Sequence, residues 1–449
     1  MPTTSNTAVL PLWTLVPFGV YLLLIAVMPL FFGHFWERNR NKLIVAGLVS
    51  LPVVAFLLGV HPGGMHLILH SLREYLGFMA LLTALFVISG GIYLRGSLAG
   101  TPLVNTGVLA LGALLGNVIG TTGASVLLIR PLLRANATRQ RVHHIVIFFI
   151  FVVSNGGGML TPLGDPPLFL GFLRGVPFSW TFRLLPVWAM ANGALLVLFN
   201  VIDQLVLNKE ERERPGSQLE EVQEVKEPLQ IEGRVNVIWL AGILTVVAAM
   251  GAFAPRLLPD ANAQGLVQIL ALAALTALSL RTTPPAIHKA NQFSWAPIAE
   301  VAVTFIGIFL TMIPALGYLE ANGSALGLTR PWHFFWAAGG LSSFLDNAPT
   351  YLTFSSLAVG VVNQATGAGL LADNLGPLAA HPVGAKLLAA VSCGAVLMGA
   401  MTYIGNGPNF MVKAIAEQNR VRMPGFFGYM LWSTAILLPI FAIITFVVF

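Results

Sequence analysis

Charge is what this sequence has least of: only 9% of its 449 residues are Asp, Glu, Lys or Arg. A soluble domain carries about 25% charged residues. Hydrophobic residues make up 56% of the chain, and water would not solvate so apolar a surface. These proportions exclude an ordinary soluble protein. They predict an all-α polytopic membrane protein whose first partner is the lipid bilayer.

Cysteines and the motifs of common enzymes are also scarce. The single cysteine, Cys393, excludes an intramolecular disulfide and any metal site built from several cysteines. The sequence contains no His-Glu-x-x-His, no Gly-x-Ser-x-Gly and no phosphate-binding loop. The chain is therefore predicted not to be an enzyme. Its net charge of +6 is interpreted as a signal for membrane orientation, and we expect no nucleic-acid partner.

Apolar runs of about 20 residues, the length that crosses a bilayer, recur along the chain. We expect about 11 transmembrane helices: a leading helix in residues 1–42, and five helices in each of two repeats, 43–202 and 235–449. Ten crossing segments can be located in the sequence, near 11–32, 43–60, 75–94, 144–173, 184–202, 235–255, 265–281, 296–318, 387–418 and 427–448. Two other apolar segments, 104–134 and 333–366, are interrupted by polar residues, Gly and Pro. We predict that they are re-entrant hairpins.

The positions of Lys and Arg give the expected orientation. If the N-terminus lies outside and each hairpin returns to its own side, most of the 24 Lys and Arg residues fall on the inside. We therefore predict a multi-pass protein of the bacterial inner (plasma) membrane. The hydrophilic stretch 203–234 separates the two halves and is predicted to be a cytoplasmic linker.

The two halves repeat the same order of elements: crossing helix, hairpin, broken helix, crossing helix. Glu74 and Glu300 precede the hairpins, with Thr122 placed 48 residues after the first and Asn347 placed 47 after the second. The long helices 144–173 and 387–418 break at related sequences, TPLGDPPLF from Thr161 and TYIGNGPNF from Thr402. An odd number of crossings separates the repeats, so their topologies are inverted. Such paired interruptions indicate a transport site near the middle of the membrane.

The breaks favour the binding of an ion. Pro lacks an N–H and Gly accepts unusual dihedral angles, so together they unwind a helix and leave carbonyl groups free. Oxygen ligands suit a small cation such as Na⁺, whereas half-helix N-termini favour an anion. The pattern therefore predicts an ion site more firmly than it predicts which ion binds. The candidate ion- or substrate-binding residues are Asn117, Thr121, Thr122, Ser125, Asn155, Thr161, Gly164, Asp165, Asp346, Asn347, Thr350, Thr402, Gly405 and Asn406.

Asp165 and Asp346 are the acids that we place at the breaks. A carboxylate at the bilayer centre costs about 2.5–3.5 kcal/mol on insertion scales, so such residues mark ion or proton pathways. Each could exchange H⁺ for Na⁺, and a Na⁺ site is predicted at Asp165, Asp346, Asn347 and Asn406. The alternative is that each Asp only caps the N-terminus of a half-helix, and the two roles are compatible.

Three other groups of residues have expected positions or roles. Asn155 is either a ligand or part of close helix packing. Glu74 and Glu300 are expected near the membrane boundaries. His143 and His144 follow a basic run and are expected at the membrane interface.

Residues 154–178 (SNGGGMLTPLGDPPLFLGFLRGVPF) and 402–416 (TYIGNGPNFMVKAIA) resemble the ion transporter superfamily. That group includes divalent-anion/sodium symporters, citrate carriers, arsenite-efflux pumps and NhaD-type sodium/proton antiporters. The chain is most similar to the bacterial branch labelled sodium:proton antiporter or citrate transporter. The resemblance implies that each hairpin tip forms a sodium site with the unwound helix beside it, with substrate between the two sites. It also implies a homodimer and an elevator-type mechanism.

Our main functional hypothesis is a Na⁺/H⁺ antiporter in which Asp165 and Asp346 exchange cation and proton, with no cofactor beyond Na⁺ or H⁺ as coupling ions. The symporters carry Ser-Asn-Thr at each hairpin tip, whereas this chain has TTGAS from Thr121 and DNAPT from Asp346. The alternative is Na⁺- or H⁺-coupled transport of citrate or another carboxylate, held by Thr122, Asn347 and Thr350. Efflux of arsenite or another oxyanion is a weaker alternative, and a membrane enzyme or a channel is disfavoured.

Overall fold

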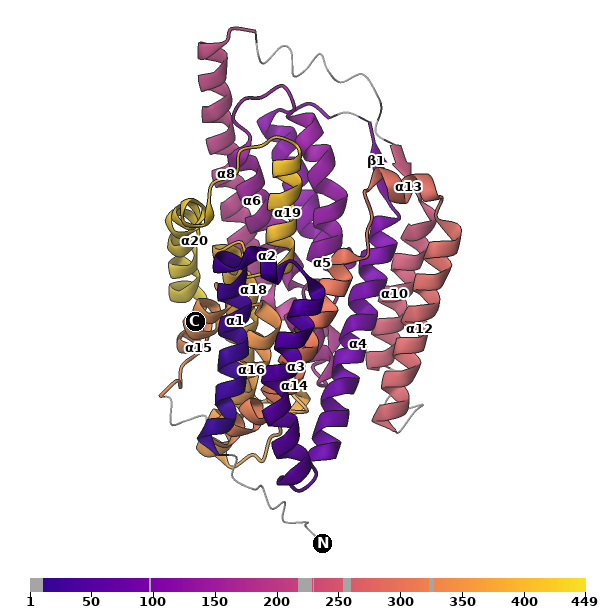
Figure 1. Ribbon diagram of the computed structural model, residues 1–449. Coiled ribbons are helices and arrows are strands. Elements are labelled where there is room, and N and C mark those ends of the chain that lie inside the picture. The colour runs from indigo at the N-terminus through magenta and orange to yellow at the C-terminus, as the bar shows by residue number, and fades with distance from the viewer. Residues whose placement is uncertain (1–10, 97, 217–227, 229, 253–259, 323–326) are drawn as a thin grey trace.

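Helices carry almost the whole chain in the computed structural model, which describes residues 11–96, 98–216, 228, 230–252, 260–322 and 327–449 (Figure 1). Within these ranges, nine helices are long and apolar enough to cross a membrane. The predicted fold class, an all-α polytopic membrane protein, is confirmed.

The first half of the chain contains two short strands and helices of very different length. Its elements are η1 (Leu12–Leu15), α1 (Val16–Phe31), α2 (Gly33–Trp36), α3 (Asn39–Gly59), α4 (Gly64–Gly90), β1 (Tyr93–Arg95), α5 (Pro102–Ala135), α6 (His143–Val152), η2 (Gly156–Met159), α7 (Pro166–Leu173), η3 (Phe178–Leu184), α8 (Leu185–Glu213) and β2 (Gln230–Glu232).

The second half repeats this order of long, broken and hairpin helices. Its elements are α10 (Val235–Ala252), α12 (Ala261–Thr282), α13 (Pro285–Ala290), α14 (Ala296–Asn322), α15 (Pro331–Ser342), α16 (Asn347–Thr366), α17 (Gly376–Ala380), α18 (Pro382–Met398), η5 (Gly399–Met401), α19 (Gly407–Gln418) and α20 (Phe426–Val448).

The first predicted hairpin is α5, which folds back on itself at Gly120. The backbone of Gly120 has φ +74° and ψ 155°, a conformation outside the helical region that glycine tolerates. The two ends of α5 therefore meet: Asn105 and Asn136 exchange side-chain hydrogen bonds of 2.9 and 2.8 Å. Although α5 is counted among the nine long apolar helices, it enters and leaves on the same side.

The second hairpin consists of α15 and α16, joined by a four-residue turn, residues 343–346. The predicted breaks are also present. The helix of the first half stops after α6 and resumes at α7, and that of the second half stops after α18 and resumes at α19. Figure 1 shows α5 in the upper part of the molecule and α15 with α16 in the lower part, so the hairpins approach the centre from opposite ends.

The linker begins later than predicted. Helix α8 continues to Glu213, because Asp203 and Glu210 turn their side chains inward to buried partners instead of ending the helix. At the other end of the linker, β2 pairs antiparallel with β1, with Tyr93 opposite Glu232. Residues 217–227 and 229 of the predicted linker lie outside the described residues.

The helices form two packed groups. We call the first the frame: in it α14 packs on α1, α3 and α4, while α12 packs on α4 and α10. We call the second the hairpin body: in it α15 and α16 pack on α18, and α5 packs on α6, α8 and α19, with α7 and α20 completing the group. The groups meet where α14 packs on α16 and where α4 packs on α5 and α7.

Candidate functional site between the two hairpins

Asp165 and Asn406 occupy equivalent positions at the two helix breaks. Each is the last residue before a half-helix, and the backbone angles agree closely: φ −146° and ψ 144° at Asp165, φ −152° and ψ 140° at Asn406. Neither side chain caps its own helix. The capping role considered for Asp165 is therefore wrong, and its carboxylate is available for contacts elsewhere.

Asp165 joins both hairpins and both breaks. Its carboxylate accepts hydrogen bonds from Thr121 Oγ1 of the first hairpin (2.9 Å) and from Asn406 Nδ2 of the second break (3.4 Å). Asn347 Nδ2, at the tip of the second hairpin, donates to the other carboxylate oxygen. The Asp165 side chain is buried, so these neutral donors replace the water that a carboxylate requires. We call these four residues the junction.

The tips are attached to the breaks in the same way in both halves. Thr161 Oγ1 donates to the Asn117 carbonyl at 2.5 Å, and Thr402 Oγ1 donates to the Ser343 carbonyl, also at 2.5 Å. This pairing makes Thr121, not Thr122, the counterpart of Asn347, and each lies 47 residues after its preceding acid, Glu74 or Glu300. The sequence analysis paired Thr122 with Asn347, and the structure corrects this pairing by one residue.

Gly164 and Gly405 allow each break to close on itself. A Cβ atom at Gly164 would lie 2.0 Å from the Gly158 carbonyl oxygen, and a Cβ atom at Gly405 would lie 2.5 Å from the Gly399 carbonyl oxygen. No side chain fits at either position. Both glycines, predicted as site residues, therefore shape the backbone of the site.

Asn155 connects the first break to the second. It donates to Asn409 Oδ1 at 2.7 Å and accepts from Asn406 Nδ2 at 3.2 Å, and Asn409 in turn donates to the Thr402 carbonyl at 2.9 Å. Asn155 therefore packs between the two breaks and bonds to the second one through its amide group, and its role as a ligand stays a prediction. When the two break sequences, TPLGDPPLF and TYIGNGPNF, are aligned, Asn409 falls opposite Leu168, so the sequence gave no reason to select it.

Other predicted residues lie near the junction without joining it. Asp346 caps α16, with its Oδ1 accepting from the Ala348 amide at 3.1 Å, as the capping alternative expected. Thr350 donates within its own helix to the Asp346 carbonyl. Ser125 pairs with the hydroxyl of Ser154 at 2.9 Å.

A small cavity of about 30 Å³ opens beside the junction. Thr121, Thr122 and Asp165 supply its polar lining, while aliphatic and aromatic side chains of α4 form the opposite wall. The cavity has room for a water molecule or a small ion. In this conformation it has no room for a larger substrate.

A buried ion pair that the sequence did not indicate links the frame to the hairpin body. Arg174, just after α7, binds Glu74 of α4 through two hydrogen bonds, 2.7 Å from Nε to Oε1 and 2.8 Å from Nη2 to Oε2. Arg174 also donates to the Ala372 carbonyl at 3.1 Å. Glu74 was expected near the membrane boundary, and its pairing partner lies 100 residues away along the chain.

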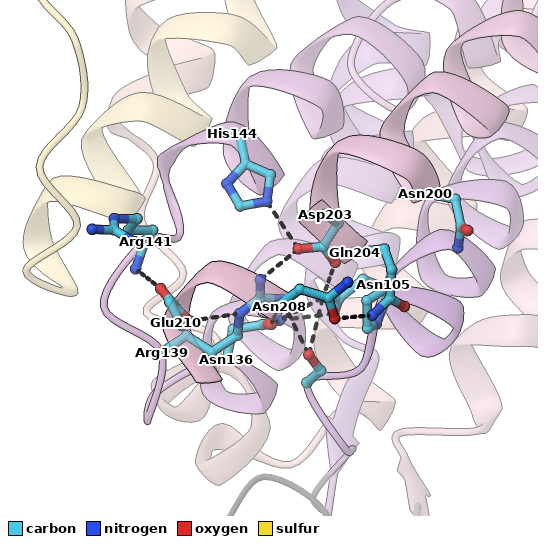
Figure 2. A network of polar contacts seen from close by, with 12 residues as sticks. Asn105, Asn136, Arg139, Arg141, His144, Asn200, Asp203, Gln204, Asn208 and Glu210 are labelled. Carbon is cyan, nitrogen blue, oxygen red and sulfur yellow. Dashed lines mark hydrogen bonds and ion pairs between the residues drawn. The ribbon is translucent and has the colours of Figure 1, made fainter. Parts of the chain in front are cut away.

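A second buried cluster holds the base of the first hairpin (Figure 2). Asp203 of α8 lies between Arg139 Nη2, at 2.6 Å from Oδ1, and His144 Nε2, at 2.9 Å from the same oxygen. Asn105 donates to Asp203 Oδ2 at 2.9 Å. His144, which was expected at the membrane interface, is 1% exposed and faces the interior of the protein. Arg139, which belongs to the basic run before His144, forms a salt bridge with Asp203 that the sequence did not indicate.

The junction has the chemistry of an ion site with one charged group. Within the described part of the chain, no three His, Cys, Asp or Glu side chains cluster as metal ligands would. One carboxylate surrounded by amides and hydroxyls suits a proton or a weakly held Na⁺ better than a tightly bound divalent metal.

Comparison with known proteins places the chain in one group. Residues 7–449 match a protein-family model described as "Putative citrate transport". A search of curated proteins finds no match. The family match covers nearly the whole chain, including both hairpins and both breaks.

Proposed function

Because the chain belongs to this citrate transport family, we propose that it is a secondary active transporter for citrate or a related carboxylate, coupled to Na⁺ or H⁺. This was the alternative hypothesis from the sequence, and the family supports it better than Na⁺/H⁺ antiport. The observation that carries the proposal is the position of Asp165. A single buried carboxylate touches both hairpin tips and the opposite break, so its occupancy by a cation or proton affects every part of the site at once.

Several half-helix N-termini favour an anionic substrate at the junction. The second arm of α5 begins after Gly120, α16 begins at Asn347, and α19 begins at Gly407. Helix N-termini carry partial positive charge and attract carboxylates. A Cβ atom at Gly407 would meet nothing within 4 Å, so a ligand can approach the backbone there. The Asp165 carboxylate accepts hydrogen bonds from side chains at these same N-termini, namely those of Thr121, Asn347 and Asn406.

The coupling ion has a candidate ligand beside Asp165. The Oδ1 atom of Asn347 is buried and accepts no hydrogen bond from any residue that the structure describes. Buried acceptors are nearly always satisfied in native proteins, so this oxygen is available to coordinate a cation. A Na⁺ ion between this oxygen and the Asp165 carboxylate would satisfy both. A proton on Asp165 would instead neutralise its charge.

The transport movement in this proposal carries the hairpin body past the frame. The contacts at the junction, together with the Asn155–Asn409 bond, connect the two halves of the chain within the hairpin body. Breaking the site apart would cost all of these contacts, whereas moving it as a unit would keep them. This distribution of contacts supports an elevator-type movement, and the resemblance to the ion transporter superfamily supports a homodimer.

Labelled citrate uptake into proteoliposomes under separate Na⁺ and pH gradients tests the proposal. Uptake by the wild-type protein should exceed uptake without a gradient, and the effective gradient identifies the coupling ion. Asp165→Asn should lose gradient-driven uptake by at least about tenfold, since charge-assisted hydrogen bonds of about 1.5–3 kcal/mol disappear. Citrate counterflow should persist, because it needs no net ion movement. Gradient-driven uptake by Asp165→Asn at the wild-type rate would contradict the assignment.

Na⁺/H⁺ antiport remains a second candidate for one specific reason. The junction residues bonded to Asp165 are neutral, and among the described contacts of Asp165 there is no Arg or Lys to hold a substrate carboxylate. In liposomes without citrate, a pulse of external Na⁺ that alkalinises the lumen would establish antiport. A response that requires citrate would establish cotransport.

A further inference from the structure

An open pocket of about 430 Å³ lies between η3 and the start of α18, outside the junction. Its volume is in the range of small-molecule sites, about 300–1,000 Å³. Small residues of α17 and α18, mainly alanines, form much of its wall. Helix α8 starts directly after η3 and carries the chain to the linker, so the pocket is at the end of the molecule opposite the linker.

The polar lining of this pocket is cationic. It contains the exposed side chains of Arg183 and Lys386 and the partly buried His381, with no acidic residue among the lining residues. In the part of the chain that the structure describes, neither Arg183 nor Lys386 has a carboxylate partner. Two adjacent cations without counter-ions repel each other, and a bound anion would relieve that repulsion.

The walls of the pocket are held in place. The Arg183 guanidinium lies over the Trp180 ring, 5.4 Å from its centroid, and Trp180 Nε1 donates to the Ala379 carbonyl at 3.1 Å. His381 Nδ1 accepts from the amides of Val383 and Gly384, both at 3.2 Å. The neutral imidazole therefore carries its proton on Nε2, which remains a donor. The pocket thus offers a guanidinium, an ammonium and an imidazole N–H.

The pocket is also connected to the candidate transport site. Thr181, two residues before Arg183, donates to the Leu160 carbonyl at 2.7 Å, next to Thr161 of the first break. Under the orientation predicted from Lys and Arg, this end faces outward, where cations are few. Two of these outward-facing cations, Arg183 and Lys386, line the same pocket, so positive charge is concentrated there.

We propose that this pocket is an outer recruitment site for a multivalent carboxylate anion, which binds there before reaching the junction. The inference rests on the proposed function, because it assigns the substrate class of that same transporter. Positive charge near the opening of a site raises the local concentration of an anionic ligand and the rate at which it binds. Salt screens this attraction between exposed charges.

The test is the salt dependence of citrate uptake by the double variant Arg183→Gln/Lys386→Gln in oriented proteoliposomes of zwitterionic lipid. Its KM from the pocket side should rise about 3- to 10-fold at low salt, with kcat unchanged, since steering affects capture. The increase of KM with salt that we expect for the wild-type protein should largely disappear in the double variant. Uptake from the linker side should not change. Arg330→Gln, which removes a charge at the same end of the helices, is the control and should behave as wild type.

An unchanged KM with an unchanged salt dependence in the double variant would overturn the proposal. An effect confined to vesicles that contain anionic lipid would show a lipid phosphate in the pocket and would also overturn it. If the wild-type protein transports no carboxylate, the proposed function fails. Equilibrium dialysis of labelled citrate against purified protein then decides whether the pocket binds the anion. Binding that is lost in the double variant supports the anion site, and equal binding by both proteins overturns it.

Discussion

At the scale of single residues, two aspartates of the same predicted role behave differently because of the residues that follow them. Asp165 precedes Pro166 and Pro167, which have no N–H to offer, so its side chain turns to the opposite half of the protein. Asp346 precedes the free amide of Ala348 and caps it. The prolines thus leave the Asp165 carboxylate available to the junction, whereas the Ala348 amide holds the Asp346 carboxylate at the start of α16.

Asp346→Ala should therefore lower stability while leaving coupling intact. Loss of an N-cap costs about 1 kcal/mol, which a thermal unfolding curve of the purified protein would register as a lower Tm. Gradient-driven citrate uptake should remain near the wild-type rate. If uptake disappears while Tm is unchanged, Asp346 is an ion ligand and the capping interpretation is wrong.

Gly164→Ala and Gly405→Ala should each abolish transport, because the added Cβ would overlap a backbone carbonyl at 2.0 or 2.5 Å. The neighbouring backbone would have to move, and the junction would move with it. Gly193→Ala on α8 is the matched control, since its Cβ would meet no atom within 4 Å and the residue has no part in the site. Initial uptake rates of the three variants, normalised to protein in the membrane, provide the comparison. Wild-type uptake by Gly164→Ala would contradict this account of the break.

At the scale of helices, ion pairs decide which elements stay together. Glu74 of α4 and Glu300 of α14 lie in the helices that precede the two hairpins, yet their partners differ. Glu300 binds Lys42 at 2.5 Å and joins two frame helices, α14 and α3, whereas Glu74 binds Arg174 and joins the frame to the hairpin body. Under the proposed movement, the first pair persists through a transport cycle and the second must separate.

Glu74→Gln should shift the protein away from this conformation. Removing one partner of a buried ion pair costs about 3–5 kcal/mol where the pair forms, and costs less in a conformation in which Arg174 reaches water. Distances between spin labels on α4 and α18 would report a new population. The double variant Glu74→Gln/Arg174→Gln should recover part of the original distribution, and Glu300→Gln should not alter it. An unchanged distance distribution in Glu74→Gln would show that the pair is not a link that opens.

Asp203→Asn should destabilise the base of the first hairpin. It would remove the shorter of the two ion pairs of buried Arg139 and leave only Glu210, 3.6 Å away, so the expected cost is at the lower end of about 3–5 kcal/mol. Glu213→Gln is the matched control on the same helix. Its partner Arg141 is partly exposed, so the cost should be at most about 1 kcal/mol. Thermal unfolding of both variants checks the difference, and equal Tm values would show that the cluster contributes little.

At the scale of the whole molecule, the sequence predicted the elements better than it predicted their contacts. Hydrophobic run lengths and the Gly and Pro interruptions predicted both hairpins and both breaks, because these features are local. Arg139, Arg174 and Asn409 were not selected, because each gains its role from residues distant in the chain. The start of the linker was placed too early for a similar reason: Asp203 has a charge that suggests solvent, but its partners are buried with it.

The short strand pair has a consequence for how far the two groups of helices can separate. Strand β1 is fastened to the frame through β2, and Asn236 next to β2 donates to the Gly91 carbonyl at 2.9 Å. Only six residues connect Arg95 of β1 to Pro102, where the first hairpin starts. Fully extended, this tether reaches about 25 Å. The distance that the first hairpin can move away from the frame is therefore limited by this tether. Inserting residues into the tether would allow a longer movement without changing any residue of the ion site.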